Sequence, residues 1–142
     1  KDLNKYPELM LLHRFWLLPG LLLCLLVYFI GGFSSVAVGV MLGSALLMNQ
    51  ASAVNYFCHK YGKRRYKTSD QSTNNVWVAL LSFGEGWHNN HHYYPATARA
   101  GFFWWELDFY YMAIWVFEKL GLVWDVRQPR PEMLEKAALT KT

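Results

Sequence analysis

One long stretch without charge constrains the fold of this chain more than any other feature. Residues 15 to 58 contain no Asp, Glu, Lys, Arg or His, a run of 44 residues. As one straight helix the run would be about 66 Å long at roughly 1.5 Å per residue, whereas the hydrocarbon core of a bilayer is about 30 Å thick. The run therefore predicts two membrane-spanning helices that fold back on each other.

The glycine pair Gly31-Gly32 is the best candidate for the turn between these helices, because glycine accepts backbone conformations that end a helix. We predict helices over residues 9–30 and 33–59 that form a hairpin. Pro19 either kinks the first helix or marks its first turn.

Positive charges outside the run predict its orientation. Five of the eight residues from 60 to 67 are basic, and Lys1, Lys5 and Arg14 lie before the run. By the positive-inside rule both ends of the hairpin face the cytoplasm. The net charge of +4 is explained in this way, and no nucleic-acid-binding motif accompanies it. Nucleic acid is therefore not an expected partner.

Three of the five histidines lie in one short motif. Residues 84–92 read G-E-G-W-H-N-N-H-H, which places His88, His91 and His92 at i, i+3 and i+4. On a helix these side chains share one face and can converge on one or two metal ions. The H-E-x-x-H pattern of zinc proteases and C-x-x-C pairs are absent. Imidazole ligands suit zinc, copper or iron, and they do not choose among these metals.

Three residues near this motif are further candidates. His59, at the end of the second predicted helix, is a fourth candidate ligand. Asn55 lies at i−4 from His59 and either joins the polar site, directly or through a water, or is an interfacial residue without a role. Glu85 either accepts a hydrogen bond from a ligand imidazole or is an exposed carboxylate.

The remaining sequence predicts a helical cap above the membrane. Residues 76–83 are apolar but too short for a span, and they predict a surface helix. Residues 102–122 are dense in Trp, Tyr and Phe and predict an interfacial helix, because a third span would bring several acidic groups into hydrocarbon. We predict an all-α protein in three parts: a transmembrane hairpin (1–59), a cytoplasmic cap (60–126) and a C-terminal tail (127–142).

These motifs together resemble the integral-membrane fatty acyl desaturases of the stearoyl-CoA (delta-9) type, especially their bacterial members. His13 departs from the family pattern, in which an acidic residue is more common at this place. The segments that carry the resemblance are Lys5-Tyr6-Pro7-Glu8-Leu9, Asn55-x-x-x-His59, residues 70–75, residues 84–92 and Trp104-Trp105-Glu106-Leu107-Asp108.

The resemblance implies a fold and a ligand set. Family members have four transmembrane helices under a cytoplasmic cap whose histidines hold two non-haem irons. The implied metal ligands are His59, His88, His91 and His92, with Asn55 linked through a water. The first two histidine boxes of the family and the first two helices are absent. We therefore expect this chain to be the C-terminal half of a desaturase, inactive as a fragment by itself.

The resemblance also implies a reaction. A full-length enzyme of this type uses O2 to insert a cis double bond into a saturated acyl chain, carried as acyl-CoA or acyl-lipid. Its partners are the fatty acyl substrate, the lipid bilayer and an electron donor, either a ferredoxin or a cytochrome b5-like protein. The implied location is the bacterial inner membrane.

Three alternatives remain at the level of sequence. A related histidine-box membrane hydroxylase would use the same ligands. A non-catalytic remnant hairpin would retain only half of a metal site. A zinc or haem site built from the same histidines is the third alternative.

Overall fold

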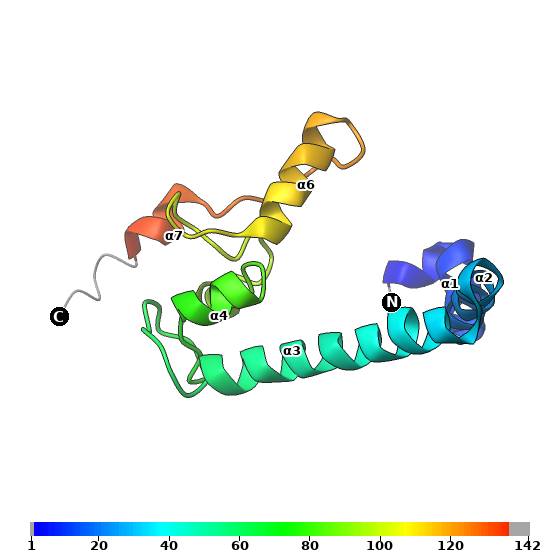
Figure 1. Cartoon of the computed structure of the whole chain (residues 1–142). Helices are drawn as coiled ribbons and strands as arrows, with labels where there is room; N and C mark the ends of the chain where they lie inside the picture. Colours follow the sequence, from blue (N-terminus) through cyan, green and yellow to red (C-terminus); the bar gives the residue numbers. More distant parts are fainter. Residues whose placement is uncertain (1, 137–142) are drawn as a thin grey trace. The chain divides into compact units, whose positions relative to one another are not determined.

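The computed structural model describes residues 2–136, and within this range it is helical without a β-strand. The predicted all-α class is confirmed. An isolated bridge between Lys63 and Asn74 is the one piece of extended pairing among the described residues. The elements are η1 (Asp2–Lys5), α1 (Pro7–Arg14), α2 (Leu18–Ser35), the π-helix η2 (Val36–Leu42), α3 (Gly43–Cys58), α4 (Val76–Leu81), α5 (His88–Tyr93), α6 (Phe109–Lys119) and α7 (Pro131–Lys136). Figure 1 labels α1, α2, α3, α4, α6 and α7.

The chain divides into two compact units, Lys1–Asn49 and Gln50–Thr142, with the division inside α3. The first unit holds the apolar helices. The second holds the end of α3 and the helices α4, α5, α6 and α7, together with the histidine motif. The predicted boundaries after residues 59 and 126 stay a prediction.

The apolar helices contain the candidate membrane span. The helical stretch Leu18–Cys58 has 41 residues, and its most apolar window has a mean hydropathy of 2.3, with no residue of that window buried inside the protein. Gly32 leaves the helical conformation, with φ 70° and ψ −169°, so a break occurs inside the predicted glycine pair. The closing of the two arms into a hairpin stays a prediction.

The first predicted helix, residues 9–30, is wrong as a single element. The chain forms α1 and then α2, and Phe15 between them has a non-helical backbone, with φ −113° and ψ 43°. Pro19 lies in the first turn of α2, where its missing N–H removes no helical hydrogen bond. Pro19 therefore begins a helix rather than kinking one. The second arm ends at Cys58, one residue before the predicted end.

The loop after α3 is tied back to that helix and leads into α4. The backbone N–H of Thr73 donates to Cys58 O at 2.7 Å. The Asn75 side chain then accepts hydrogen bonds from Trp77 N at 3.1 Å and Val78 N at 3.2 Å. These bonds satisfy the free N–H groups at a helix start. Helix α4 therefore forms within the predicted range 76–83.

The aromatic region forms a shorter helix than predicted. Helix α6 begins at Phe109 because the Asp108 carboxylate accepts a hydrogen bond from Tyr111 N at 2.9 Å and caps the helix. The other Asp108 oxygen accepts from Ala100 N at 2.7 Å and Gly101 N at 3.1 Å. Residues before 109, predicted as helix, therefore form a loop folded around this carboxylate.

The predicted C-terminal tail is partly helical, since α7 occupies Pro131–Lys136. The backbone N–H of Ala98 donates to Arg127 O at 3.0 Å and ties the start of this segment to the second unit. The last six residues of the predicted tail, 137–142, lie outside the described residues.

Gly86, which precedes α5, is predicted to be intolerant of a side chain. A Cβ at this position would overlap the backbone N of Ala79 and lie 2.5 Å from Asn75 O. We expect Gly86→Ala to lower the free energy of unfolding by about 2–4 kcal/mol, because backbone atoms cannot move away cheaply. Gly20→Ala is the matched control, since a Cβ there meets no atom within 4 Å. Thermal unfolding of both variants in detergent checks the expectation, and equal midpoints would contradict it.

Candidate metal centre

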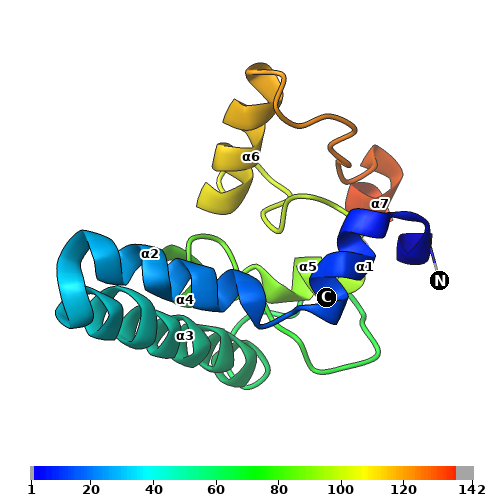
Figure 2. The same ribbon diagram turned by 90° about the vertical axis from the view of Figure 1, so that its right-hand side faces the viewer.

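Two helix ends bring histidine side chains together in the second unit. His59 directly follows α3, and His88 and His92 lie on α5, a short helix labelled in Figure 2. His59 Nε2 lies 3.2 Å from His88 Nε2. One ring nitrogen from each of the three histidines lies within 4.8 Å of the other two. Three imidazole nitrogens at this spacing can ligate one metal ion.

His91 lies on the same helix but outside this group of three. Its ring centre is 6.3 Å from that of His88 and 5.7 Å from that of His92. The structure therefore brings together three of the four histidines that were predicted as metal ligands. His91 as a metal ligand stays a prediction.

The protein around His88 keeps this histidine neutral. Its side chain is buried, and burial is the main cause that lowers the pKa of His88 to about 4. The neighbouring imidazoles of His92, His59 and His91 lower this pKa further, because each disfavours a second positive charge. At neutral pH His88 therefore carries the lone pair that a metal ligand requires.

Asp70 contacts the histidine group, and no spacing rule predicted this contact from the sequence. Its Oδ2 atom bonds to His92 Nδ1. Its Oδ1 atom accepts hydrogen bonds from Ser72 N at 2.9 Å and from Thr68 Oγ1 at 3.0 Å. Hydrogen bonds from Ser72, and further ones from Thr68 and His92, hold the pKa of Asp70 well below its usual range.

Glu85 and Asn55, which were predicted to support the ligands, have side chains that lie in other surroundings than Asp70. Glu85 is exposed, and among the described residues its side chain has no hydrogen-bond partner. Partial desolvation raises the pKa of Glu85. The Asn55 side chain donates to Ala51 O at 3.0 Å, within its own helix. Among the described residues, the structure therefore brings the side chain of Asp70, and the side chain of neither of these two, into a hydrogen bond with a histidine of the group.

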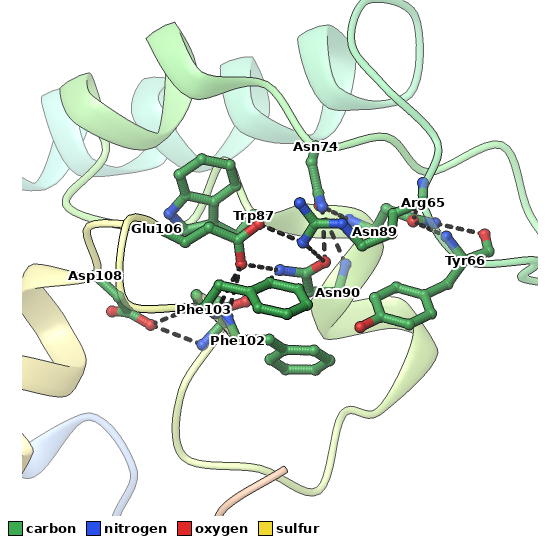
Figure 3. Close-up of polar contacts among 12 residues, drawn as sticks. Arg65, Tyr66, Asn74, Trp87, Asn89, Asn90, Phe102, Phe103, Glu106 and Asp108 are labelled. Atoms are coloured by element: carbon green, nitrogen blue, oxygen red, sulfur yellow. Dashed lines mark hydrogen bonds and ion pairs between the residues drawn. The ribbon is translucent and has the colours of Figure 1, made fainter. Parts of the chain in front are cut away.

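The asparagines between the histidines attach α5 to the rest of the unit. Asn89 and Asn90 are fully buried. Asn89 Oδ1 accepts from Arg65 N at 2.9 Å and Tyr66 N at 2.6 Å, and Asn89 Nδ2 donates to Tyr66 O at 3.0 Å. Asn74 Oδ1 accepts from the backbone N–H groups of Asn89 at 2.9 Å and Asn90 at 3.1 Å. These contacts, drawn in Figure 3, fix the start of α5.

A buried acidic residue completes this hydrogen-bond network. Glu106 pairs with Arg65, and its Oε2 accepts from Asn90 Nδ2 at 2.8 Å and from Phe102 N at 2.7 Å. Asn90 Oδ1 accepts from Asn74 Nδ2 at 2.7 Å. Figure 3 shows the Asn90 amide between the Arg65–Glu106 pair and Asn74. Glu106 is therefore satisfied inside the protein.

Removal of the Asn90 amide should loosen this network. Asn90→Ala would remove hydrogen bonds from the buried side chains of Glu106 and Asn74 and from the half-buried side chain of Arg65. Each buried polar group left without its partner costs about 1–3 kcal/mol, so we expect a loss of about 2–4 kcal/mol of stability. Asn49→Ala is the matched control, because within the described part of the chain this exposed amide on α3 bonds only to Ala45 O of its own helix. Urea unfolding of the two variants measures the difference.

The stability of the metal-free protein should depend on pH through His88. Its pKa is about 4 in the folded protein and 6.5 ordinarily, so the unfolded chain binds more protons between these values. Folding stability should therefore fall as the pH is lowered from 6.5 to 4, by about 2–3 kcal/mol in full. Thermal unfolding over this pH range should show a shallower slope for His88→Gln. An equally steep slope in the variant would contradict the assignment.

Comparisons with known proteins agree on one family. The fatty acid desaturase family matches residues 3–128. The icosanoyl-CoA 5-desaturase of Limnanthes douglasii is 38% identical over 135 residues, which cover 95% of this chain and 38% of that protein. The sn-2 palmitoyl-lipid 9-desaturase of Nostoc sp. (strain 36) is 39% identical over 131 residues, covering 92% of this chain and 46% of that protein.

A third relative extends the same pattern. The sn-1 stearoyl-lipid 9-desaturase of Anabaena variabilis is 39% identical over 127 residues, covering 89% of this chain and 47% of that protein. The chain thus spans roughly two fifths to one half of the length of these relatives. The family match covers most of the chain, including the apolar helices and all the histidines of the candidate centre. The chain belongs to the fatty acid desaturase family.

Proposed function

We propose that the protein carrying this chain is a membrane fatty acyl desaturase that inserts a cis double bond into a saturated acyl chain. The observation that carries the proposal is the gathering of His59, His88 and His92 directly after an apolar helix. Family membership supports it, and the relatives are named for acyl-CoA and acyl-lipid desaturation. The substrate is accordingly an acyl-CoA or an acyl-lipid.

The donor atoms fit an iron centre. Neutral imidazole nitrogens are suitable ligands for iron, and His88 is held neutral by its surroundings. The proposed centre contains two non-haem irons, for which His59, His88 and His92 supply part of the ligands. His91 supplies another ligand, and further ligands complete the set in the full-length gene product. Bound iron would supply the activation of O2.

The overall reaction balances with an external reductant. A –CH2–CH2– unit, O2, two electrons and two protons give –CH=CH– and two molecules of water. The electrons come from a donor protein, a ferredoxin or a cytochrome b5-like protein. The chain's own part is to hold the ligands rigidly at the end of an apolar helix, where an acyl chain from the bilayer can reach them.

The proposed location is an integral membrane protein of a bacterial inner membrane, with the histidines on the cytoplasmic side. The exposed basic residues that follow His59 support this orientation, since positive charge favours the cytoplasmic face. Asn55, one helical turn before His59, is proposed to reach the centre through a water. Glu85 is proposed to turn its exposed side chain inward on metal binding and then to accept a hydrogen bond from a ligand imidazole.

Histidine variants of the full-length gene product test the proposal in a host that lacks its own desaturase. We expect the wild type to produce a new monounsaturated fatty acid, and His88→Ala and His91→Ala to abolish it, because each removes a proposed metal ligand. His13→Ala is the matched control, since this exposed histidine lies on α1, outside the group. Gas chromatography of fatty acid esters measures the product, and iron analysis of the purified proteins measures the metal.

Each contrary result has a definite meaning. A hydroxy fatty acid without an alkene would replace the desaturase with a hydroxylase. One zinc and no iron in the active wild type would overturn the di-iron centre. No product despite good expression and a supplied electron donor would overturn the catalytic proposal.

A further inference from the structure

Asp70 uses its two carboxylate oxygens for different partners. Oδ1 accepts from Ser72 N and Thr68 Oγ1, both within the loop that carries Asp70. Oδ2 bonds to Nδ1 of His92, which is 22 residues away in sequence. One oxygen therefore fixes the carboxylate in its loop, and the other is left to act on the histidine.

The bond to Nδ1 determines what the rest of the His92 ring can do. A carboxylate can only accept, so Nδ1 must carry the proton, and in the neutral ring Nε2 then carries the lone pair. A carboxylate in this place orients a metal-bound imidazole and makes it a better donor. We propose that Asp70 is a positioning residue that holds His92 with Nε2 directed to the metal. The inference rests on the proposed metal centre and assigns the carboxylate that supports one of its ligands.

The loop around Asp70 is itself held in place. The Arg64 guanidinium donates to Thr68 O at 2.6 Å and to Asp70 O at 2.7 Å. On the other side, Ser72 is buried, and its hydroxyl accepts from Asn89 Nδ2 at 3.3 Å. Asn89 belongs to α5, the helix that carries His92. The loop and the histidine are therefore anchored to the same helix, which fixes the direction of Oδ2 relative to the ring.

The substitution Asp70→Asn separates a positioning role from a structural one. The Asn carbonyl can keep the Oδ1 bonds to Ser72 N and Thr68, so the loop is retained. The Asn amide would then donate to His92 Nδ1, which forces the proton onto Nε2 and removes the ligand lone pair. Thr68→Val is the matched control, because it removes a bond to Oδ1 and leaves the Oδ2 contact with His92 intact.

Cobalt(II) provides a readout that does not depend on turnover. We expect the metal-stripped full-length protein with Asp70→Asn to bind Co2+ tenfold to a hundredfold more weakly than the wild type in competition with a chelator. Its visible Co2+ absorption bands should shift, whereas the metal-free protein should remain folded, as its thermal unfolding transition shows. Thr68→Val should keep both the affinity and the spectrum of the wild type.

A double-variant cycle tests whether Asp70 acts through His92. In a His92→Ala background, Asp70→Asn should cause no further loss of Co2+ affinity, because the ring that it positions is gone. A full additional loss in that background, or wild-type affinity and spectrum for Asp70→Asn alone, would overturn the inference. Failure of the wild type to bind Co2+ or iron would instead overturn the proposed metal centre, so the two failures are distinguishable.

Discussion

The hydrogen bonds of two buried amides, Asn89 and Asn90, determine where the histidines of this protein lie. Helix α5 has six residues, fewer than an isolated helix needs to be stable in water. Its position must therefore come from bonds to other segments. The amides bond to the loop after α3, to Asn74 and to Glu106, while the histidines on the same helix remain directed elsewhere. Buried structural amides and the proposed ligand histidines thus lie side by side within one short motif.

The pair of Arg65 and Glu106 adds specificity at an energetic cost. Glu106 is almost completely buried, and desolvation of a carboxylate is expensive unless all its oxygens are bonded. Here the Glu106 oxygens are bonded by Arg65, by the Asn90 amide and by the backbone N–H of Phe102. A rearranged loop would leave a buried charge without partners, so the network penalises alternative placements of α5. An apolar core of the same size would not discriminate among them in this way.

The sequence predicted those features that depend on local pattern. The uncharged run predicted the apolar helices, Gly32 lies in a conformation that ends a helix, and the histidine spacing predicted the meeting of His88 and His92. Contacts between distant segments carry no such pattern. Asp70 reaches His92 through a loop whose shape depends on Thr68 and Ser72, so no spacing rule identifies it. The break near residue 15 is a local feature, and for it the sequence had left two outcomes open, a kink at Pro19 or a helix that begins there.

The balance of buried residues explains why a metal ion would matter to the fold as well as to the reaction. Among the described residues, more polar or charged side chains than apolar ones are buried, so directional bonds hold the second unit together more than an apolar core does. His59, His88 and His92 lie close together at the edge of this network, and the neighbouring rings disfavour a positive charge on His88. A metal cation bound by the three ring nitrogens would add attractive bonds between these segments. Because it would bind the folded arrangement and not the unfolded chain, it would stabilise the geometry that its ligands require.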